Sequence, residues 1–175
     1  TRDALAQRQR IFLDVLPLLF HTNHPMLPGY ISHQAPSGIV DYTPSKSNIA
    51  LAQRLARSFC YSEDPTKKRC ILSLFLMGSV GTVAHSESSD LDIWVCYDNT
   101  LSKPQLDELD HKCKLLSQWA EQLGLEAHFF LMDCESFIQG KVVSFDSESS
   151  GSAQHYLLLD EFYRTALLIC GKHPM

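Results

Sequence analysis

The sequence predicts an α/β domain, a short mixed sheet packed with helices. Two short apolar runs, residues 70–77 and 91–97, flank a segment of small and polar residues, and a third run covers 125–132. A long amphipathic stretch, 104–123, lies between the second and third runs. Bounded apolar runs rich in aliphatic and aromatic residues are typical of buried strands, and a 3.6-residue apolar period is typical of a helix.

The N-terminal part is predicted to form two helices joined by a loop. Residues 3–20 carry apolar side chains at helical spacing, and prolines prevent the helix from continuing through 21–44. A second helix is expected over 47–59. It is followed by a polar connection that ends in Lys67-Lys68-Arg69 at the start of the first strand. Because that end lies opposite the Gly78-Ser79 turn, we expect a solvated basic cluster there rather than a phosphate clamp.

The C-terminal part supplies the sheet. Pro104 opens the long helix and Gly124 ends it. A crossover helix of this length normally joins parallel strands, so the second and third strands should begin at the same edge of the sheet. A Ser/Gly-rich segment, 144–152, then leads to a strongly apolar stretch, 154–170, for which we predict a closing helix.

Length and composition fit one globular domain spanning residues 1–175, with a helical, proline-rich part over 1–69 and the core over 70–175. The abrupt ends of the chain suggest a piece of a longer protein. The net charge of −5 argues against nucleic acid as a partner. The six cysteines contain no CxxC pair, which favours reduced thiols over a disulfide framework. No apolar run reaches the length of a membrane span, and no signal peptide is apparent, so we expect a cytoplasmic protein.

The residues that carry chemistry lie between the first two strands. Gly78-Ser79 directly follows the first strand, where a glycine lets backbone N–H groups approach a phosphate and a serine adds a hydroxyl donor. Asp90-Leu91-Asp92 enters the second strand, so both carboxylates point to one face. Two carboxylates on one face favour a bound cation, and Mg²⁺ is commonly held by carboxylates together with substrate phosphates.

Each motif alone is common, and an isolated Asp-x-Asp is usually a solvated strand end. Both together, at strand boundaries and about ten residues apart, predict a two-metal site for phosphoryl or nucleotidyl transfer. Ser89, just before the acidic pair, would help to hold phosphate or cap a turn.

The pattern resembles the signature of the polymerase-β-like nucleotidyltransferase superfamily, and within it the chain is similar to the N-terminal catalytic region of the bacterial class I adenylate cyclases. The resemblance runs over nearly the whole chain. It is carried by four stretches: residues 24–30 (HPMLPGY), 77–79 (MGS), 88–96 (SSDLDIWVC) and 154–166 (QHYLLLDEFYRTA).

The resemblance implies conversion of ATP to 3′,5′-cyclic AMP and pyrophosphate with two Mg²⁺ (or Mn²⁺) ions. It implies that Gly78 and Ser79 contact the triphosphate and that Asp90 and Asp92 bind the metals. It also implies a regulatory region elsewhere in the full-length chain, and a regulator from a sugar-transport system as a partner.

The superfamily usually takes a third carboxylate from a later strand, and here Glu126 and Asp133 are the candidates. Parallel strands would place Glu126 beside the aspartates, so Glu126 is preferred as metal ligand and as acceptor of the 3′-hydroxyl proton. His128 shares its face and is expected to be a hydrogen-bonded core histidine rather than a partner of the site. Gln154 and His155, at the start of the closing helix, are candidates for contacting the substrate.

Two other functions stay open at this point. A nucleotidyltransferase that acts on a separate protein, small-molecule or RNA acceptor would use the same motif. A non-catalytic nucleotide-binding module could keep the same fold.

Overall fold

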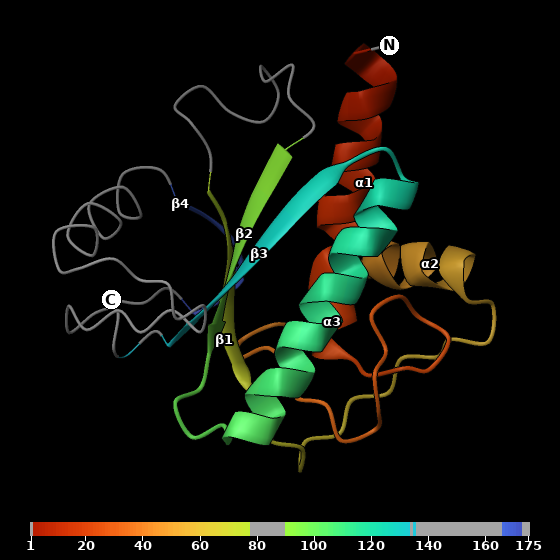
Figure 1. The fold of residues 1–175 in the computed structure, drawn as a ribbon. Helices are drawn as coiled ribbons and strands as arrows, with labels where there is room; N and C mark the ends of the chain where they lie inside the picture. The colour runs from red at the N-terminus through yellow and green to blue at the C-terminus, as the bar shows by residue number, and fades with distance from the viewer. Residues whose placement is uncertain (1, 78–89, 134, 136–165, 173–175) are drawn as a thin grey trace, which may run out of the picture.

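The computed structural model describes residues 2–77, 90–133, 135 and 166–172. Within these ranges the chain forms three helices and four strands (Figure 1). In chain order they are α1 (Arg2–His21), α2 (Lys46–Leu55), β1 (Ile71–Met77), β2 (Asp90–Tyr97), α3 (Lys103–Gln122), β3 (Glu126–Asp133) and β4 (Ala166–Gly171).

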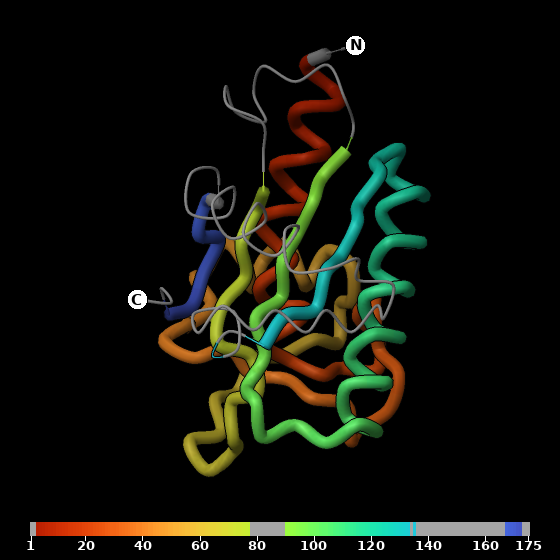
Figure 2. The backbone as a smooth tube through the Cα atoms, turned by 60° about the vertical axis from the view of Figure 1, so that its left-hand side comes forward, coloured from red at the N-terminus to blue at the C-terminus, as the bar shows by residue number. Residues whose placement is uncertain are grey.

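The strands form one mixed sheet in the order β3-β2-β1-β4. β1 pairs antiparallel with both β2 and β4, whereas β2 and β3 are parallel. Figure 2 shows the strands side by side, with α1 passing behind them and α3 beside β3. The predicted α/β class with a short mixed sheet is therefore confirmed, and so is the parallel pairing expected from the crossover helix.

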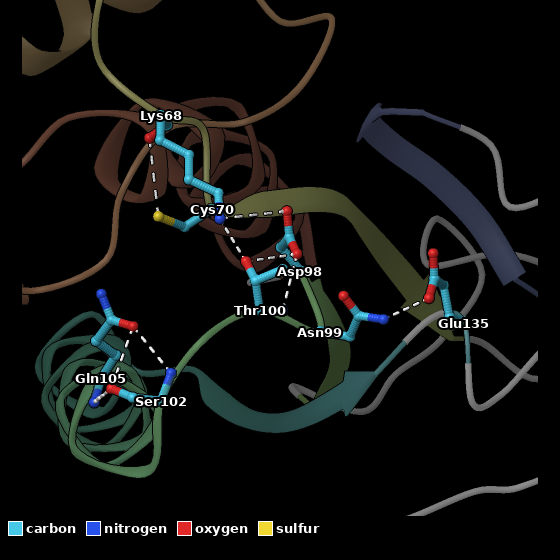
Figure 3. A network of polar contacts seen from close by, with 8 residues as sticks. All are labelled: Lys68, Cys70, Asp98, Asn99, Thr100, Ser102, Gln105 and Glu135. Carbon is cyan, nitrogen blue, oxygen red and sulfur yellow. Dashed lines mark hydrogen bonds and ion pairs between the residues drawn. The ribbon is translucent and has the colours of Figure 1, made fainter.

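Side-chain hydrogen bonds determine where α3 begins. The Ser102 hydroxyl accepts from the backbone N–H of Gln105, whose side chain accepts from the backbone N–H of Ser102, forming a capping box (Figure 3). In the preceding turn, the Asp98 carboxylate accepts from the backbone N–H and the hydroxyl of Thr100, both at 2.9 Å. These bonds lower the pKa of Asp98, although its partial burial opposes them. The turn thus directs the chain from the end of β2 into α3.

The main hydrophobic core lies between the sheet and the helices. Alternate residues of β2, including Leu91 and Ile93, are buried on the face that α1 and α3 cover. α2 packs against α1, and the Asn48 side chain ties the two by donating to the carbonyl of Asp14 at 2.9 Å. The buried apolar residues that α1 and α3 contribute are Phe12, Val15, Leu16, Leu18, Leu19, Phe20, Leu109, Cys113, Leu116 and Ala120.

The prediction of a helix over 154–170 is wrong for its last residues, because 166–171 form β4. The run from Leu167 to Cys170 is apolar at every position, so neither a helical nor a strand period is visible in it. β1 has one edge on β2, and its other edge carries backbone groups that require partners, which β4 supplies. Residues 154–165 lie outside the described residues, as do the segment 144–152 and the turn at 78–89.

Two further expectations concern the cysteines and the membrane. No disulfide joins the described cysteines, of which Cys96 and Cys113 are buried and Cys60 is exposed. Burial raises the pKa of the Cys170 thiol to about 12, which keeps it protonated at neutral pH. Of the helices in the described ranges, none combines the length and apolarity that crossing a bilayer requires.

Candidate active site at the start of β2 and β3

Asp90 and Asp92 project from one face of β2, at the start of the strand. Both side chains are exposed, while the intervening Leu91 and the next residue, Ile93, are buried in the main core. This alternation follows from the two-residue period of a strand, which separates the carboxylates from the apolar side chains. The common face of the two aspartates, predicted from their spacing, is confirmed.

β3 brings a third carboxylate to the same edge. In the parallel register Asp90 lies opposite Glu126, and Asp92 lies opposite His128. Neighbouring strands are about 4.8 Å apart, so these positions adjoin. Asp133 pairs with Tyr97 at the far end of the strand, about 23 Å further along at the usual rise per residue. The register therefore confirms that Glu126 lies beside the aspartates, as expected from parallel strands.

The Glu126 side chain makes a hydrogen bond within its own strand. Its Oε1 lies 3.1 Å from Nε2 of His128, and both side chains are about half exposed. The expectation of a core histidine is thus wrong for His128. The two-residue period is the sequence signal that places the two side chains on one face.

The carboxylates of Asp90, Asp92 and Glu126 suit a divalent cation in their chemistry and in their positions on the two strands. Three carboxylates occupy adjoining positions at one strand edge, and hard oxygen donors are what Mg²⁺ prefers. Within the described residues, however, no three His, Cys, Asp or Glu side chains converge as a ligand set. The Glu126 carboxylate is hydrogen-bonded to His128 and would have to leave that contact to join a ligand set. The residues therefore fit a metal in type and in position along the strands, but their side chains are not arranged around one point.

A shallow hollow of about 630 Å³ opens beside this edge, between the end of α3 and the start of β3. Glu126, His128 and Phe130 line it together with Ser117 and Glu121 of α3. Of the three carboxylates, Glu126 is therefore accessible from this hollow, which Asp90 and Asp92 do not line.

Five predicted site residues, Gly78, Ser79, Ser89, Gln154 and His155, lie outside the described residues. β1 ends at Met77, which pairs with Asp92. Gly78, the first residue of the glycine-serine motif, therefore directly follows the residue that lies opposite Asp92. The roles of these five residues remain predictions.

The whole chain, residues 1–175, matches the family described as the adenylate cyclase NT domain. The adenylate cyclase of Salmonella typhimurium is 42% identical over 160 residues, which cover 90% of this chain and 19% of the relative. The adenylate cyclase of Escherichia coli K12 gives the same values. That of Proteus mirabilis is 37% identical over 177 residues, which cover 97% of this chain and 20% of the relative.

No solved structure matches the chain. The chain spans about a fifth of the length of the curated relatives that it matches. Since the match covers every residue of this sequence, the chain belongs to the adenylate cyclase N-terminal domain family.

Proposed function

We propose that the protein is an adenylate cyclase that converts ATP to 3′,5′-cyclic AMP and pyrophosphate, with its catalytic centre at the start of β2 and β3. The observation that carries the proposal is the register of Asp90 with Glu126, next to Asp92 on the same face. The curated relatives are named adenylate cyclase, which supports the same reaction. We also propose that the mixed sheet is a polymerase-β-like nucleotidyltransferase core.

In this proposal Asp90, Asp92 and Glu126 would hold divalent cations, Mg²⁺ or Mn²⁺, which would lower the pKa of the attacking hydroxyl and neutralise phosphate charge. The Glu126 carboxylate accepts the proton of the ribose 3′-hydroxyl. The 3′-oxygen then forms a bond to the α-phosphorus, the bond from that phosphorus to the bridging oxygen breaks, and pyrophosphate leaves. Gly78, Ser79, Ser89, Gln154 and His155 are proposed to contact ATP.

The proposal is tested by incubating the full-length protein with ATP and Mg²⁺ or Mn²⁺ and identifying the products. We expect cyclic AMP, and a loss of at least about 100-fold in kcat for Asp90→Asn, because a neutral amide binds a divalent cation poorly. Asp107→Asn changes an exposed carboxylate of α3 and is the matched control. Pyrophosphate released only with an added acceptor would instead indicate transfer to a separate molecule, and failure to bind ATP would contradict both reactions.

A further inference from the structure

A second cavity lies at the other end of the sheet from the acidic edge. It has a volume of about 300 Å³, and its walls come from the end of α1, the loop that follows and the connection before β1. Arg69 lines it two residues before β1 begins, whereas Asp92 pairs with Met77, where β1 ends. In Figure 1 this end of the sheet is at the bottom and the starts of β2 and β3 are at the top. The volume is at the lower end of the range for small-molecule sites.

A buried histidine sets the hydrogen bonding of the cavity wall. Nδ1 of His21 accepts from the backbone N–H of Ile39 at 2.9 Å, so the ring proton of the neutral imidazole is on Nε2. Nε2 lies 3.2 Å from the hydroxyl of Tyr61 and therefore donates to it. Burial, reinforced by Arg69 and Lys67, lowers the pKa of His21 to about 4, which keeps the ring neutral.

This arrangement leaves the Tyr61 hydroxyl with a proton to donate. Its oxygen accepts from His21, and none of the described residues accepts its O–H. Because Tyr61 lines the cavity, the hydroxyl is available as a donor to a bound molecule.

Two cations line the same cavity. Arg69 donates through Nη1 to the carbonyls of Ile39 and Tyr42 at 3.1 and 3.2 Å, which fixes its guanidinium. Lys67 is exposed, and its position beside the cavity is reflected in its effect on the pKa of His21. The expected solvated basic cluster is therefore wrong for Arg69, which is anchored to the backbone.

Two carboxylates at the cavity are already engaged. Glu63 accepts from Nη2 of Arg69 at 2.8 Å, and its side chain is half exposed. Asp64 accepts from the backbone N–H and the hydroxyl of Thr66, which lowers its pKa. Glu63 thus occupies the place at which an anionic group of a ligand would contact Arg69.

We propose that this cavity binds a small phosphate monoester, whose phosphate contacts Lys67, Tyr61 and Arg69 in place of the Glu63 carboxylate. A phosphate monoester carries more negative charge than a carboxylate and offers three acceptor oxygens, so it can displace the single carboxylate of Glu63. The rings of Phe59 and His24 pack edge to face, with their centroids 5.4 Å apart, and form a wall for the carbon part of the ligand. The site is separate from the proposed cyclase centre and does not depend on it.

The test is calorimetric titration of the full-length protein with glycerol 3-phosphate, with glycerol and lactate as comparison ligands. We expect binding of glycerol 3-phosphate alone, weakened about tenfold by Lys67→Ala and by Tyr61→Phe, each of which removes one charge-assisted hydrogen bond. Glu63→Gln should tighten binding, because it removes the charge that competes for Arg69.

Lys68→Ala is the matched control, because Lys68 belongs to the same basic triplet but its ammonium contacts Thr100 and Asp98 (Figure 3). We expect it to leave the affinity unchanged, as we do for Asp90→Asn. Absence of binding, equal binding of lactate, or equal losses for the two lysine variants would overturn the proposal. Loss of binding in Asp90→Asn would do so too, since the probe would then occupy the acidic edge.

Discussion

Asp90 and Glu126 lie opposite each other across the parallel pairing of β2 and β3, although α3 separates them in sequence. Asp133, the other acidic residue of β3, lies opposite Tyr97 at the far end. Two acidic residues of one strand are therefore at opposite ends of it, and substituting each in turn separates the proposed catalytic carboxylate from one outside the proposed site.

Glu126→Gln should lower the kcat of cyclic AMP formation by at least about 100-fold, because it removes both the proposed metal ligand and the proposed proton acceptor. Asp133→Asn should leave kcat within a few-fold. The measurement is cyclic AMP formation by the full-length protein at saturating Mg²⁺. Equal effects of the two substitutions would show that the register does not determine the third ligand.

Lys112→Met should stabilise the protein at neutral pH. Lys112 is 2% exposed, and its ammonium lies 5.9 Å from the ring centroid of Phe20. Burial lowers its pKa from 10.5 to about 8, so the unfolded chain binds this proton more tightly than the folded chain. The cost to folding is therefore complete below pH 8 and disappears as the pH rises toward 10.5, with a size of about 3 kcal/mol.

Urea unfolding at pH 7 and at pH 10 measures this effect, and the gain from Lys112→Met should shrink between the two. Lys114→Met is the control, since Lys114 is 71% exposed and pairs with Asp110 at 3.0 Å. A Lys112→Met variant less stable than the parent at pH 7 would show that the cation makes a net favourable contribution.

His21→Asn should make folding less sensitive to acid. The folded-state pKa of about 4 lies below the ordinary value of 6.5, so the contribution of the neutral ring to stability is complete above pH 6.5 and is lost as the pH falls toward 4. An asparagine amide oxygen can still accept from the N–H of Ile39 but does not titrate in this range. Thermal unfolding between pH 4 and 7 measures the change, and His33→Asn, at an exposed position, should keep the parental slope.

Gly171→Ala should weaken the attachment of β4. A Cβ at this position would lie 2.3 Å from the carbonyl oxygen of Leu72 and 2.7 Å from Cα of Ser73, and φ is +95°. Because backbone atoms must move, we expect a loss of more than about 2 kcal/mol in the free energy of unfolding. Gly124→Ala also has positive φ, at +76°, but its Cβ would meet only the Arg8 guanidinium at 3.9 Å. That control should lose about 1 kcal/mol, and equal losses would exclude the steric cause.

Sequence reasoning reached the acidic edge because its geometry depends on two short-range rules. The two-residue period of a strand places Asp90 and Asp92 together, and a crossover helix makes β2 and β3 parallel, which places Glu126 beside them. Both rules use residues of one strand or of consecutive elements of the chain, so no contact between distant segments had to be known.

β4 and the second cavity could not be reached in the same way. A run such as Leu167 to Cys170 has no period, and its conformation is determined by the open edge of β1. The cavity gathers His21, Tyr61 and Arg69 from loops and helix ends, where no repeat indicates which segments will meet. The sequence indicated the positive charge of Lys67 and Arg69 but not that these two residues line a cavity.

The pairing of β1 with β4 also has a consequence for the order of folding. Ser73 and its partner Gly171 are about a hundred positions apart, whereas β2 begins only thirteen positions after the end of β1. At about 5–20 residues per second, a ribosome needs several seconds to add the missing strand. During that interval one edge of β1 lacks its partner and is open to pairing with other chains. We expect pulse-labelled hydrogen exchange during refolding to show the β1 amides that face β4 gaining protection last, so this edge is where a chaperone would be needed.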